Sequence, residues 1–187
     1  MTPSRALVLN ARLETRHLVL EPLAAAHAPA MFARLKDDAL YVWISAAPPE
    51  SVGHLQKRWE RLESRLAPAG DKAWLNWAVR QASDGAYVGK MDAEVDAANI
   101  ATNIGYLIFP AFWGRGYASE AVAAVIEHLR RHGVEELRAT VTSGNTASTR
   151  VLEKSGFVRT RVIPENDVIR GVKHDDIEYV LTFTPEG

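Results

Sequence analysis

The sequence predicts a mixed α/β (α+β) fold, and three observations support this prediction. The chain has 187 residues, of which 47% are hydrophobic and 24% charged, as is typical of a globular domain with a buried core. Strand-like and helix-like segments follow one another in the order β-α-α-β-β-β-α-β-α-β-β. At residues 103–125 an apolar strand, a glycine turn and an amphipathic helix come in direct succession. We expect one domain over residues 1–187, because no repeat, low-complexity segment or domain boundary interrupts the chain.

The first half of the chain is expected to supply three strands and two helices. Alternation of apolar and polar residues predicts the strands, and apolar stripes at helical spacing predict the helices. Residues 37–49 carry apolar side chains without a period and end in two prolines, which predicts a loop. The strands are expected at residues 15–21, 73–80 and 86–95, and the helices at residues 24–36 and 51–66.

The second half is expected to supply four strands and two helices. A short apolar strand ends at Pro110, which has no backbone N–H to continue it. The helix after the glycine turn ends at Gly133, a residue suited to a left-handed cap. The three residues His174-Asp175-Asp176 form a polar cluster just before the last strand, where a base or a substrate clamp is possible and a polar turn is the ordinary alternative. The strands are expected at residues 105–109, 137–141, 157–163 and 177–183, and the helices at residues 118–133 and 145–155.

Charge and cysteine content narrow the function classes. A net charge of -1 and a pI near 6.6 give no support to a general surface for nucleic acids or anionic membranes. The sequence has no cysteine, which excludes disulfides, thiolate metal sites and a cysteine nucleophile. Neither a secretory signal nor a membrane span is evident, so a cytoplasmic protein with a small-molecule or protein partner is expected.

The glycine turn has the chemistry of a phosphate site. A helix that starts there presents unpaired backbone N–H groups, and Gly114 and Gly116 let the backbone approach an anion closely. Arg115 adds a cation between them. The turn is neither a Walker loop nor G-x-G-x-x-G, so a standard nucleotide site is not expected. Taken alone, it is equally well an ordinary connection between a strand and a helix.

A second stretch of sequence favours the phosphate site over an ordinary connection. Residues 145–157 read N-T-A-S-T-R-V-L-E-K-S-G-F and resemble the second coenzyme A signature of the GCN5-related N-acetyltransferases (GNAT). Residues 113–118, W-G-R-G-Y-A, resemble their pyrophosphate loop, with Trp113 where the family usually has Gln or Arg. That variant, the Asn-x-x-Ser spacing and the opening strand at residues 13–23 are similar to the Rim-type branch, which acetylates ribosomal-protein N termini. The resemblance covers nearly the whole chain.

The resemblance implies a mixed, mostly antiparallel sheet of about seven strands, flanked by about four helices. The sheet would be split at its central strand, with acetyl-coenzyme A inserted in the split. Backbone amides of the glycine turn would bind pyrophosphate, the central strand would pair with the pantetheine arm, and a free N–H there would polarise the thioester carbonyl. The implied cofactor-binding residues are Leu107, Ile108, Phe109, Gly114, Arg115, Gly116, Tyr117, Ala118, Ser119, Asn145 and Ser148. Asn145 also suits a plain helix N-cap, and the two roles are compatible.

The proton donor for the departing thiolate is the first catalytic assignment. Many family members place a Tyr four residues before the terminal Gly-Phe pair, and this chain has Leu152 there. One turn earlier, Ser148 lies on the same helix face, and in the Rim-type branch the matching Ser is thought to serve as the acid. Ser148 is also a common type of residue in the first turn of a helix, so a purely structural role stays open.

The general base is left open by the sequence. Asp92 and Glu94 alternate along a strand beside the centre and share a face, as a strand carboxylate does in other branches of the family. The Rim-type branch instead suggests an acid between the last two strands, where Glu165 and Asp167 lie. Each of these acids has an ordinary alternative as a solvated surface group.

Two further expectations concern the residues of the acceptor pocket and the binding of a metal. The resemblance places Tyr41, Trp43 and Trp59 at the acceptor pocket, and His174 is a candidate substrate clamp. His128 and His132 have a metal-capable spacing, but no third ligand is near them and His132 suits a helix C terminus. We therefore expect no metal.

The sequence thus predicts an acetyl-coenzyme A-dependent N-acetyltransferase in which a primary amine attacks the thioester directly. The acceptor is expected to be a protein N terminus or an amine-bearing small molecule, with no nucleic-acid or membrane partner, and a homodimer is expected only by analogy with the family. The alternative is a non-catalytic acyl-coenzyme A binding module, which Leu152 permits. A structural domain with an incidental glycine turn is the third interpretation.

Overall fold

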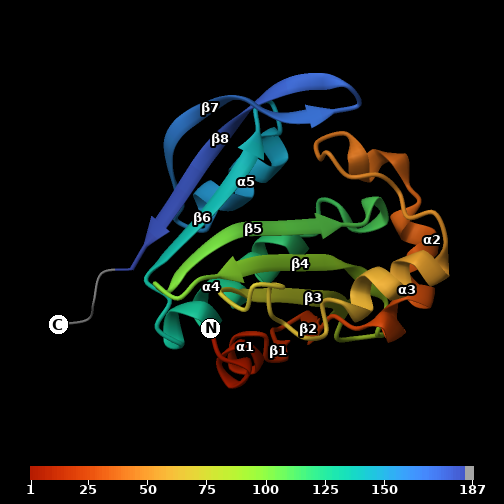
Figure 1. The fold of residues 1–187 in the computed structure, drawn as a ribbon. Coiled ribbons are helices and arrows are strands. Elements are labelled where there is room, and N and C mark those ends of the chain that lie inside the picture. Colours follow the sequence, from red (N-terminus) through yellow and green to blue (C-terminus); the bar gives the residue numbers. More distant parts are fainter. Residues whose placement is uncertain (184–187) are drawn as a thin grey trace.

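One sheet of eight strands organises the molecule, in the order β1-β2-β3-β4-β5-β6-β8-β7 (Figure 1). The computed structural model of the protein describes residues 1–183. The helices are α1 (Pro3–Leu9), η1 (Ala25–His27), α2 (Ala28–Leu35), η2 (Asp38–Tyr41), α3 (Val52–Glu60), η3 (Pro110–Phe112), α4 (Tyr117–Arg131) and α5 (Thr146–Lys154). The strands are β1 (Leu13–Glu14), β2 (Leu18–Pro22), β3 (Ala73–Gln81), β4 (Tyr87–Val95), β5 (Ile100–Ile108), β6 (Glu136–Thr142), β7 (Val158–Ile169) and β8 (Val172–Thr182).

The predicted mixed, mostly antiparallel sheet is confirmed, with β5 and β6 as its parallel pair. The sheet has one strand more than the roughly seven expected, because the chain adds the two-residue strand β1. The structure also adds the short helix α1, which begins at Pro3 with Thr2 as its N-cap. None of the helices within residues 1–183 is long and apolar enough to cross a membrane.

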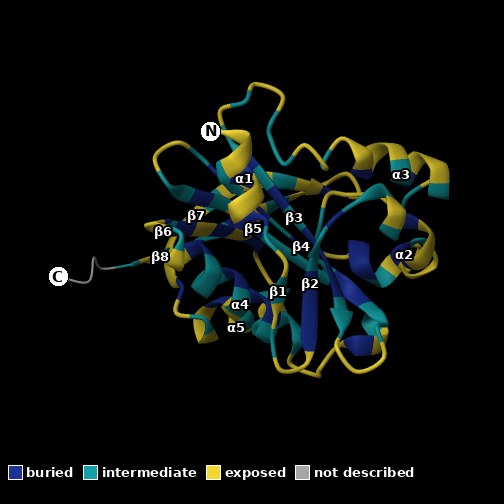
Figure 2. Ribbon diagram, turned by 90° about the horizontal axis from the view of Figure 1, so that it is seen from below, coloured by how far each residue is buried: buried dark blue, intermediate teal, exposed yellow. Residues whose placement is uncertain are grey.

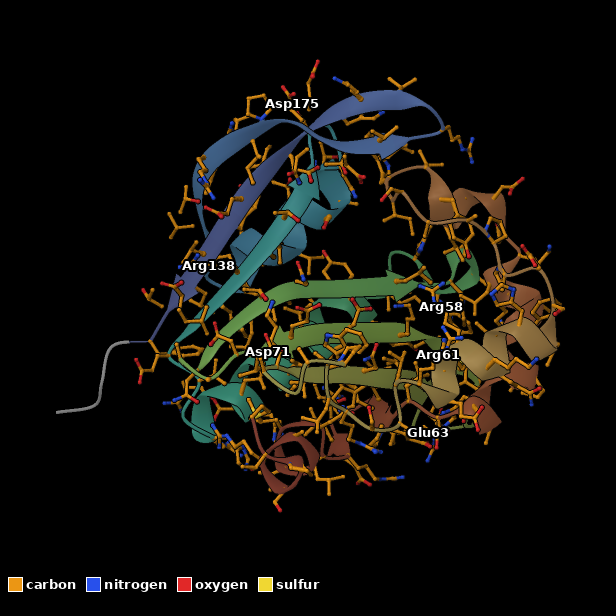
Figure 3. All side chains as sticks on the ribbon, in the orientation of Figure 1. Arg58, Arg61, Glu63, Asp71, Arg138 and Asp175 are labelled. Carbon is orange, nitrogen blue, oxygen red and sulfur yellow. The ribbon has the colours of Figure 1, made fainter. Side chains whose placement is uncertain are left out.

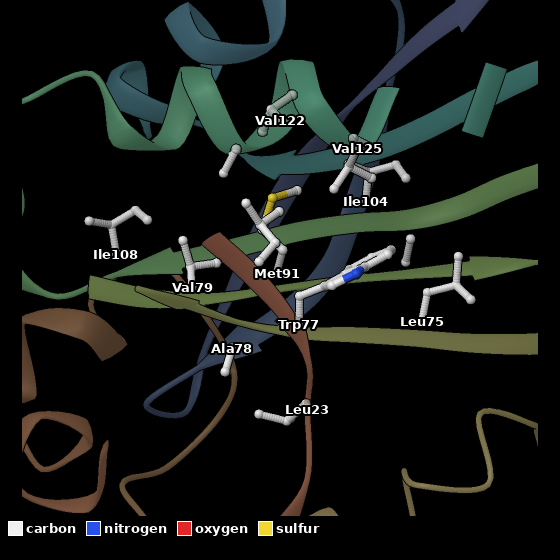
Figure 4. Packing of buried hydrophobic residues seen from close by; sticks show 14 of the residues in the cluster. Leu23, Leu75, Trp77, Ala78, Val79, Met91, Ile104, Ile108, Val122 and Val125 are labelled. Carbon is white, nitrogen blue, oxygen red and sulfur yellow. The ribbon is translucent and has the colours of Figure 1, made fainter. Parts of the chain in front are cut away.

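The helices divide between the two faces of the sheet. Helices α4 and α5 cover one face, and α2 and α3 lie against the other, toward the end of β5 (Figures 1 and 2). The core under α4 contains Trp77, Met91, Ile104, Val122 and Val125, all of them buried (Figure 4). Because alternate residues of a strand point to opposite faces, the remaining side chains of β3, β4 and β5 face α2 and α3.

The sheet splits between β5 and β6. In the described chain these two strands pair only at Ile100 with Glu136 and at Ala101 with Leu137. Directly afterwards, residues 103 and 104 of β5 lie opposite the single residue Ala93 of β4, which is a β-bulge. Asn103 has φ 54°, a left-handed conformation that Asn tolerates better than most residues. A bulge bends its strand, so this one turns β5 away from β6 where the pairing stops.

The β7–β8 hairpin differs from the expectation. Residues 164–176 were expected as a connection, but β7 and β8 are long strands that meet at Arg170 and Gly171. Both turn residues have positive φ, as a tight hairpin turn requires. The position expected for His174-Asp175-Asp176, just before the last strand, and the alternative of a polar turn are therefore wrong, since these residues lie inside β8. Pairing of β8 with β7 holds this polar segment extended, and Asp176 also pairs with Thr142 of β6.

Other boundaries shift by a few residues. Helix α3 ends at Glu60 rather than Leu66, and Arg65 has φ 57°, which no α-helix accommodates. Strand β5 begins at Ile100, five residues before the expected start, because pairing with β4 includes residues on the far side of the bulge. The loop expected over residues 37–49 contains the short helix η2, capped by the Asp37 side chain.

Candidate active site

Two cavities lie on opposite sides of β5. The larger, of about 410 Å³, is bounded by α3, the segment after η2 and the strand face that carries Asn76, Asp92 and Glu94. The smaller, of about 250 Å³, lies in the split and is bounded by β5, β6, α5 and the β7–β8 hairpin. Three residues line both cavities, namely Ile44, Gly105 and Tyr106. The bent part of β5 is therefore a wall common to both cavities.

The glycine turn starts α4 as expected. Gly114 and Gly116 have φ 73° and 80°, and Gly116 is the N-cap of the 15-residue helix. A Cβ at either glycine would meet no protein atom within 4 Å, so the space in front of the helix is open. Arg115 lies 5.4 Å from the centre of the Phe112 ring. Open space, free helix N–H groups and a nearby guanidinium fit the pyrophosphate of coenzyme A.

Trp113 fixes the start of this turn to the end of β5. Its indole Nε1 donates to the Ile108 carbonyl at 2.6 Å, while half of the side chain remains exposed. The Phe109 N–H donates to Val88 at 2.8 Å and so is not available to a ligand. Within the stretch of residues 107–109 expected to pair with pantetheine, the Ile108 carbonyl and the Phe109 N–H are thus already bonded, and Leu107 and Ile108 also lie in the ladder with β4.

Glu120 secures the first turn of α4 to the turn before β2. Its carboxylate accepts from Thr15 Oγ1 at 2.6 Å, and from the His17 backbone N–H at 2.8 Å. His17 Nδ1 lies 2.9 Å from the other carboxylate oxygen. Burial alone would raise the pKa of Glu120, but these hydrogen bonds and the His17 ring outweigh it and lower the pKa.

At the start of α5, two hydroxyl groups meet over the split. Asn145 caps the helix by accepting from the Ser148 N–H at 3.2 Å, which confirms the expected capping geometry. The Ser148 hydroxyl lies 2.8 Å from the Tyr106 hydroxyl. Tyr106 also donates to the Ser148 carbonyl at 3.2 Å. Leu152, where many family members have Tyr, is buried beside them and lines the smaller cavity.

Tyr106 was not among the residues singled out from the sequence. Its phenol approaches the helix from β5, 42 residues earlier in the chain. Burial raises the pKa of Tyr106, and the hydrogen bond with Ser148 offsets only part of that effect, so the phenol is protonated at neutral pH. The sequence signal that could have identified Tyr106 is its position on the strand at which the split is predicted.

The two acids on β4 both face the larger cavity, as their spacing predicted. Lys90 forms an ion pair with Asp92, and Lys72 Nζ lies 3.3 Å from Glu94. Gly105 stands opposite Asp92, and a Cβ there would lie only 2.7 Å from the Asp92 carboxylate. The missing side chain of Gly105 thus makes room for Asp92. Each of these carboxylates already has a lysine as partner.

The acids of the β7–β8 hairpin are placed differently. Asp167 and Asp176 line the smaller cavity, and Asp176 is 6% exposed. Glu165, the other acid considered there, instead pairs with Lys173 at 2.5 Å and lines neither cavity. Asp176 is distinguished in the sequence only as part of the polar cluster at residues 174–176, because its burial depends on strand pairing.

The expected acceptor residues fall into three groups. Tyr41 and Trp59 line the larger cavity, and the Tyr41 hydroxyl donates to the Leu35 carbonyl at 2.7 Å. Trp43 lines the smaller cavity and packs against Gly144, where a Cβ would come within 3.2 Å of the indole. His174 stands opposite Asp167 in the hairpin but lines neither cavity. Arg58, on α3, lines the larger cavity near the end of β5 (Figure 3).

The histidine pair on α4 serves the fold. His128 Nε2 lies 3.1 Å from the carbonyls of Val8 and Leu9, and His132 Nδ1 lies 2.8 Å from the His128 carbonyl. The bonds of His128 attach the end of α1 to α4, and the bond of His132 closes the end of α4 itself. Within residues 1–183 no group of three or more His, Cys, Asp or Glu side chains is arranged to hold a metal ion.

Comparisons with known proteins identify the family and the fold. The family model described as "Acetyltransferase (GNAT) domain" matches residues 17–158. The uncharacterized N-acetyltransferase YoaA of Bacillus subtilis (strain 168) is 25% identical over 171 residues, which cover 90% of this chain and 95% of YoaA.

Two solved structures share the fold. RimL, a ribosomal L7/L12 alpha-N-protein acetyltransferase in complex with coenzyme A, superposes with a TM-score of 0.80 at 20% identity, over 92% of this chain and 98% of RimL. The ribosomal-protein-S5-alanine acetyltransferase from Vibrio fischeri gives a TM-score of 0.81 at 15% identity, over 95% of this chain and 99% of that protein. The chain belongs to the GNAT family of acetyltransferases and is an acyltransferase.

Proposed function

We propose that the protein transfers the acetyl group of acetyl-coenzyme A to a primary amine, either a protein N terminus or a small molecule. The observation that carries this proposal is the meeting of Tyr106 and Ser148 at 2.8 Å in the split beside β5. Both hydroxyls line a cavity that opens where β5 and β6 stop pairing. Amides at the start of α4, around Gly116, would hold the pyrophosphate.

The reaction is a direct attack without a covalent enzyme intermediate. The amine nitrogen forms a bond to the thioester carbonyl carbon, and the carbon–sulfur bond breaks. Ser148, hydrogen-bonded to the protonated Tyr106, would supply the proton that the departing thiolate takes up. The backbone of β5 beyond Ala101, which β6 leaves unpaired in the described chain, would position the thioester.

Asp167 is the base that the arrangement of charges favours. A base must accept the proton that the ammonium gives up, which requires a free lone pair within reach of the amine. Asp92 and Glu94 already bind Lys90 and Lys72. Asp167 has no lysine or arginine partner in the described chain and lines the cavity that holds Ser148. This assignment agrees with the position expected for the Rim-type branch.

The first experiment is calorimetric titration with acetyl-coenzyme A of the wild-type protein and of the Gly116→Glu variant. We expect one binding site in the wild type and loss of binding in the variant, because a carboxylate would clash with and repel the pyrophosphate. Gly85→Glu is the matched control, since Gly85 has φ 73° in a distant turn and should suffer the same backbone strain. Retained affinity in Gly116→Glu would remove the turn from the cofactor site.

Turnover separates the enzyme from a non-catalytic binding module. Acetylation is measured by mass spectrometry across tetrapeptides with free N termini and small primary amines that include n-butylamine. Although Leu152 removes the usual tyrosine of the family, the Tyr106 and Ser148 hydroxyls supply a proton donor close by. We therefore expect at least one acceptor to be acetylated. Tight cofactor binding with no product from any amine would favour the binding module.

A further inference from the structure

Asp176 is a buried carboxylate with one oxygen left without a partner. The residue lies on β8, is 6% exposed and lines the 250 Å³ cavity in the split. Its Oδ2 accepts from Asn166 Nδ2 at 2.7 Å, whereas its Oδ1 is buried and has no hydrogen bond. A buried carboxylate oxygen without a donor destabilises a folded protein. A hydrogen-bond donor from a ligand would satisfy this oxygen.

The charge of the cavity indicates which donor fits. Asp167 and Asp176 are its two ionisable acids, and among its lining residues within the described chain there is no lysine, arginine or histidine. The larger cavity differs, because Lys90 and Arg58 balance its two acids, Asp92 and Glu94. Two uncompensated carboxylates attract a cation, and the split is where the acceptor nitrogen must meet the thioester.

The structure of the hairpin argues against a purely architectural role for Asp176. The neighbouring Asp175 performs such a role, since its Oδ1 accepts from the Glu165 N–H at 2.9 Å and its side chain is exposed. Figure 3 shows Asp175 on the outer part of the hairpin. Asp176 projects from the opposite face of the strand, toward the cavity. One bond to Asn166 does not satisfy it.

We propose that the Asp176 carboxylate binds the ammonium group of the acceptor and holds it in the split beside Ser148 and Asp167. This inference rests on the proposed function and adds a substrate requirement to it. The acceptor enters as a primary ammonium ion, donates one N–H to Asp176 and loses another proton to Asp167 before attack. Neutral nucleophiles such as alcohols lack the charge that this pair of acids selects.

The test compares Asp176→Asn with Asp175→Asn, the matched control on the adjacent position. Asparagine keeps an oxygen for Asn166 and removes the charge. We expect the KM for the best acceptor of the amine panel to rise roughly 10- to 100-fold in Asp176→Asn, as for loss of a buried charge partner. The affinity for acetyl-coenzyme A should be unchanged in both variants. An unchanged acceptor KM in Asp176→Asn would overturn the inference.

Thermal unfolding supplies a second readout that does not need a known acceptor. Because the unsatisfied charge destabilises the unliganded protein, Asp176→Asn should raise the melting temperature by roughly 2–4 °C. n-Butylammonium chloride should stabilise the wild type and Asp175→Asn but not Asp176→Asn, whereas n-butanol and potassium chloride should act equally on all three. A wild type that shows no response specific to n-butylammonium contradicts the inference.

The two proposals fail in different ways. If the wild type does not bind acetyl-coenzyme A, the proposed function falls. If it does bind, but Asp176→Asn matches Asp175→Asn in acceptor KM and in the response to n-butylammonium, only the role of Asp176 falls.

Discussion

The two cavities beside β5 each have a wall that carries two acids, but the acids of one wall are paired with lysines and those of the other are not. On β4, Asp92 and Glu94 each lie beside a lysine. On the β7–β8 hairpin, Asp167 and Asp176 line a cavity without a cationic side chain among its described lining residues. An acid with a lysine partner has its charge balanced within the protein, whereas an unpaired one is available to a substrate. Burial and partners therefore distinguish these acids, although all four are equally acidic residues in the sequence.

The β4 wall and the hairpin wall differ in what each contributes to the candidate active site. The β4 wall, with its internal ion pairs and the room left by Gly105, defines the shape of the larger cavity. The hairpin wall supplies net negative charge close to Ser148. We infer that the first wall sets which acceptor fits and that the second prepares its nitrogen for attack.

The largest expected effect is the difference between two single variants, each of which neutralises one acid on one of the walls. Asp167→Asn should lower kcat roughly 100- to 10,000-fold, the range for loss of a general base. Asp92→Asn should change kcat by no more than about threefold, because Asp92 is occupied by Lys90. Steady-state release of coenzyme A thiol measures both. The opposite ranking of the two variants would place the base on β4 and reverse the comparison.

A smaller effect is expected at the hydroxyl pair between the walls. Ser148→Ala should lower kcat roughly 10- to 100-fold with little change in acetyl-coenzyme A affinity, because the proton donor is lost and the binding groups remain. Tyr106→Phe should act in the same direction, and the double variant should cost less than the product of the two single effects, since the hydroxyls act as one unit. Single-turnover kinetics and calorimetry give the two quantities. Additive losses would mean that the hydroxyls work independently.

The smallest effect concerns Glu120, an acid that serves the fold and lies on neither wall. The hydrogen bonds from Thr15 and His17 lower its pKa in the folded state. A lowered carboxyl pKa stabilises the protein above the unfolded-state pKa, and this stabilisation is lost as the pH falls through the folded-state value. The decrease in melting temperature from pH 7 to pH 3 should therefore be smaller in Glu120→Gln, by roughly 1–3 °C. Equal decreases in both proteins would show that Glu120 contributes nothing to acid sensitivity.

The start of α4 and of α5 could be predicted from the sequence because both are locally encoded. Gly114 and Gly116 are needed for positive φ, and Asn145 is a helix cap three residues before Ser148. Such features depend on neighbours within a few residues. The succession of strands and helices along the chain was also readable from the hydrophobic periods, and so was the alternation on β4, since a period of two fixes which side chains share a face.

The rest of the site depends on contacts between distant segments. Residues 164–176 carry little apolar alternation. They form the end of β7 and the start of β8 because these two strands pair with each other, and Asp176 also pairs with Thr142 of β6. The pairing buries Asp176, so its importance was hidden in the sequence. Tyr106 meets Ser148 only after β5 and α5 have folded against each other. Ion-pair partners, such as the lysines beside Asp92 and Glu94, likewise become known only from the structure.

The bulge at Asn103 indicates how such a split could arise by mutation. Residues 103 and 104 together oppose Ala93, and Thr102 and Gly105 face the β4 acids on either side. Without Asn103 the strand would still alternate between its two faces. The bulge absorbs the extra residue. Inserting one codon into an ordinary strand therefore bends the strand while the flanking side chains keep their faces of the sheet. A single insertion is a short genetic path from a closed sheet to one that can receive a ligand.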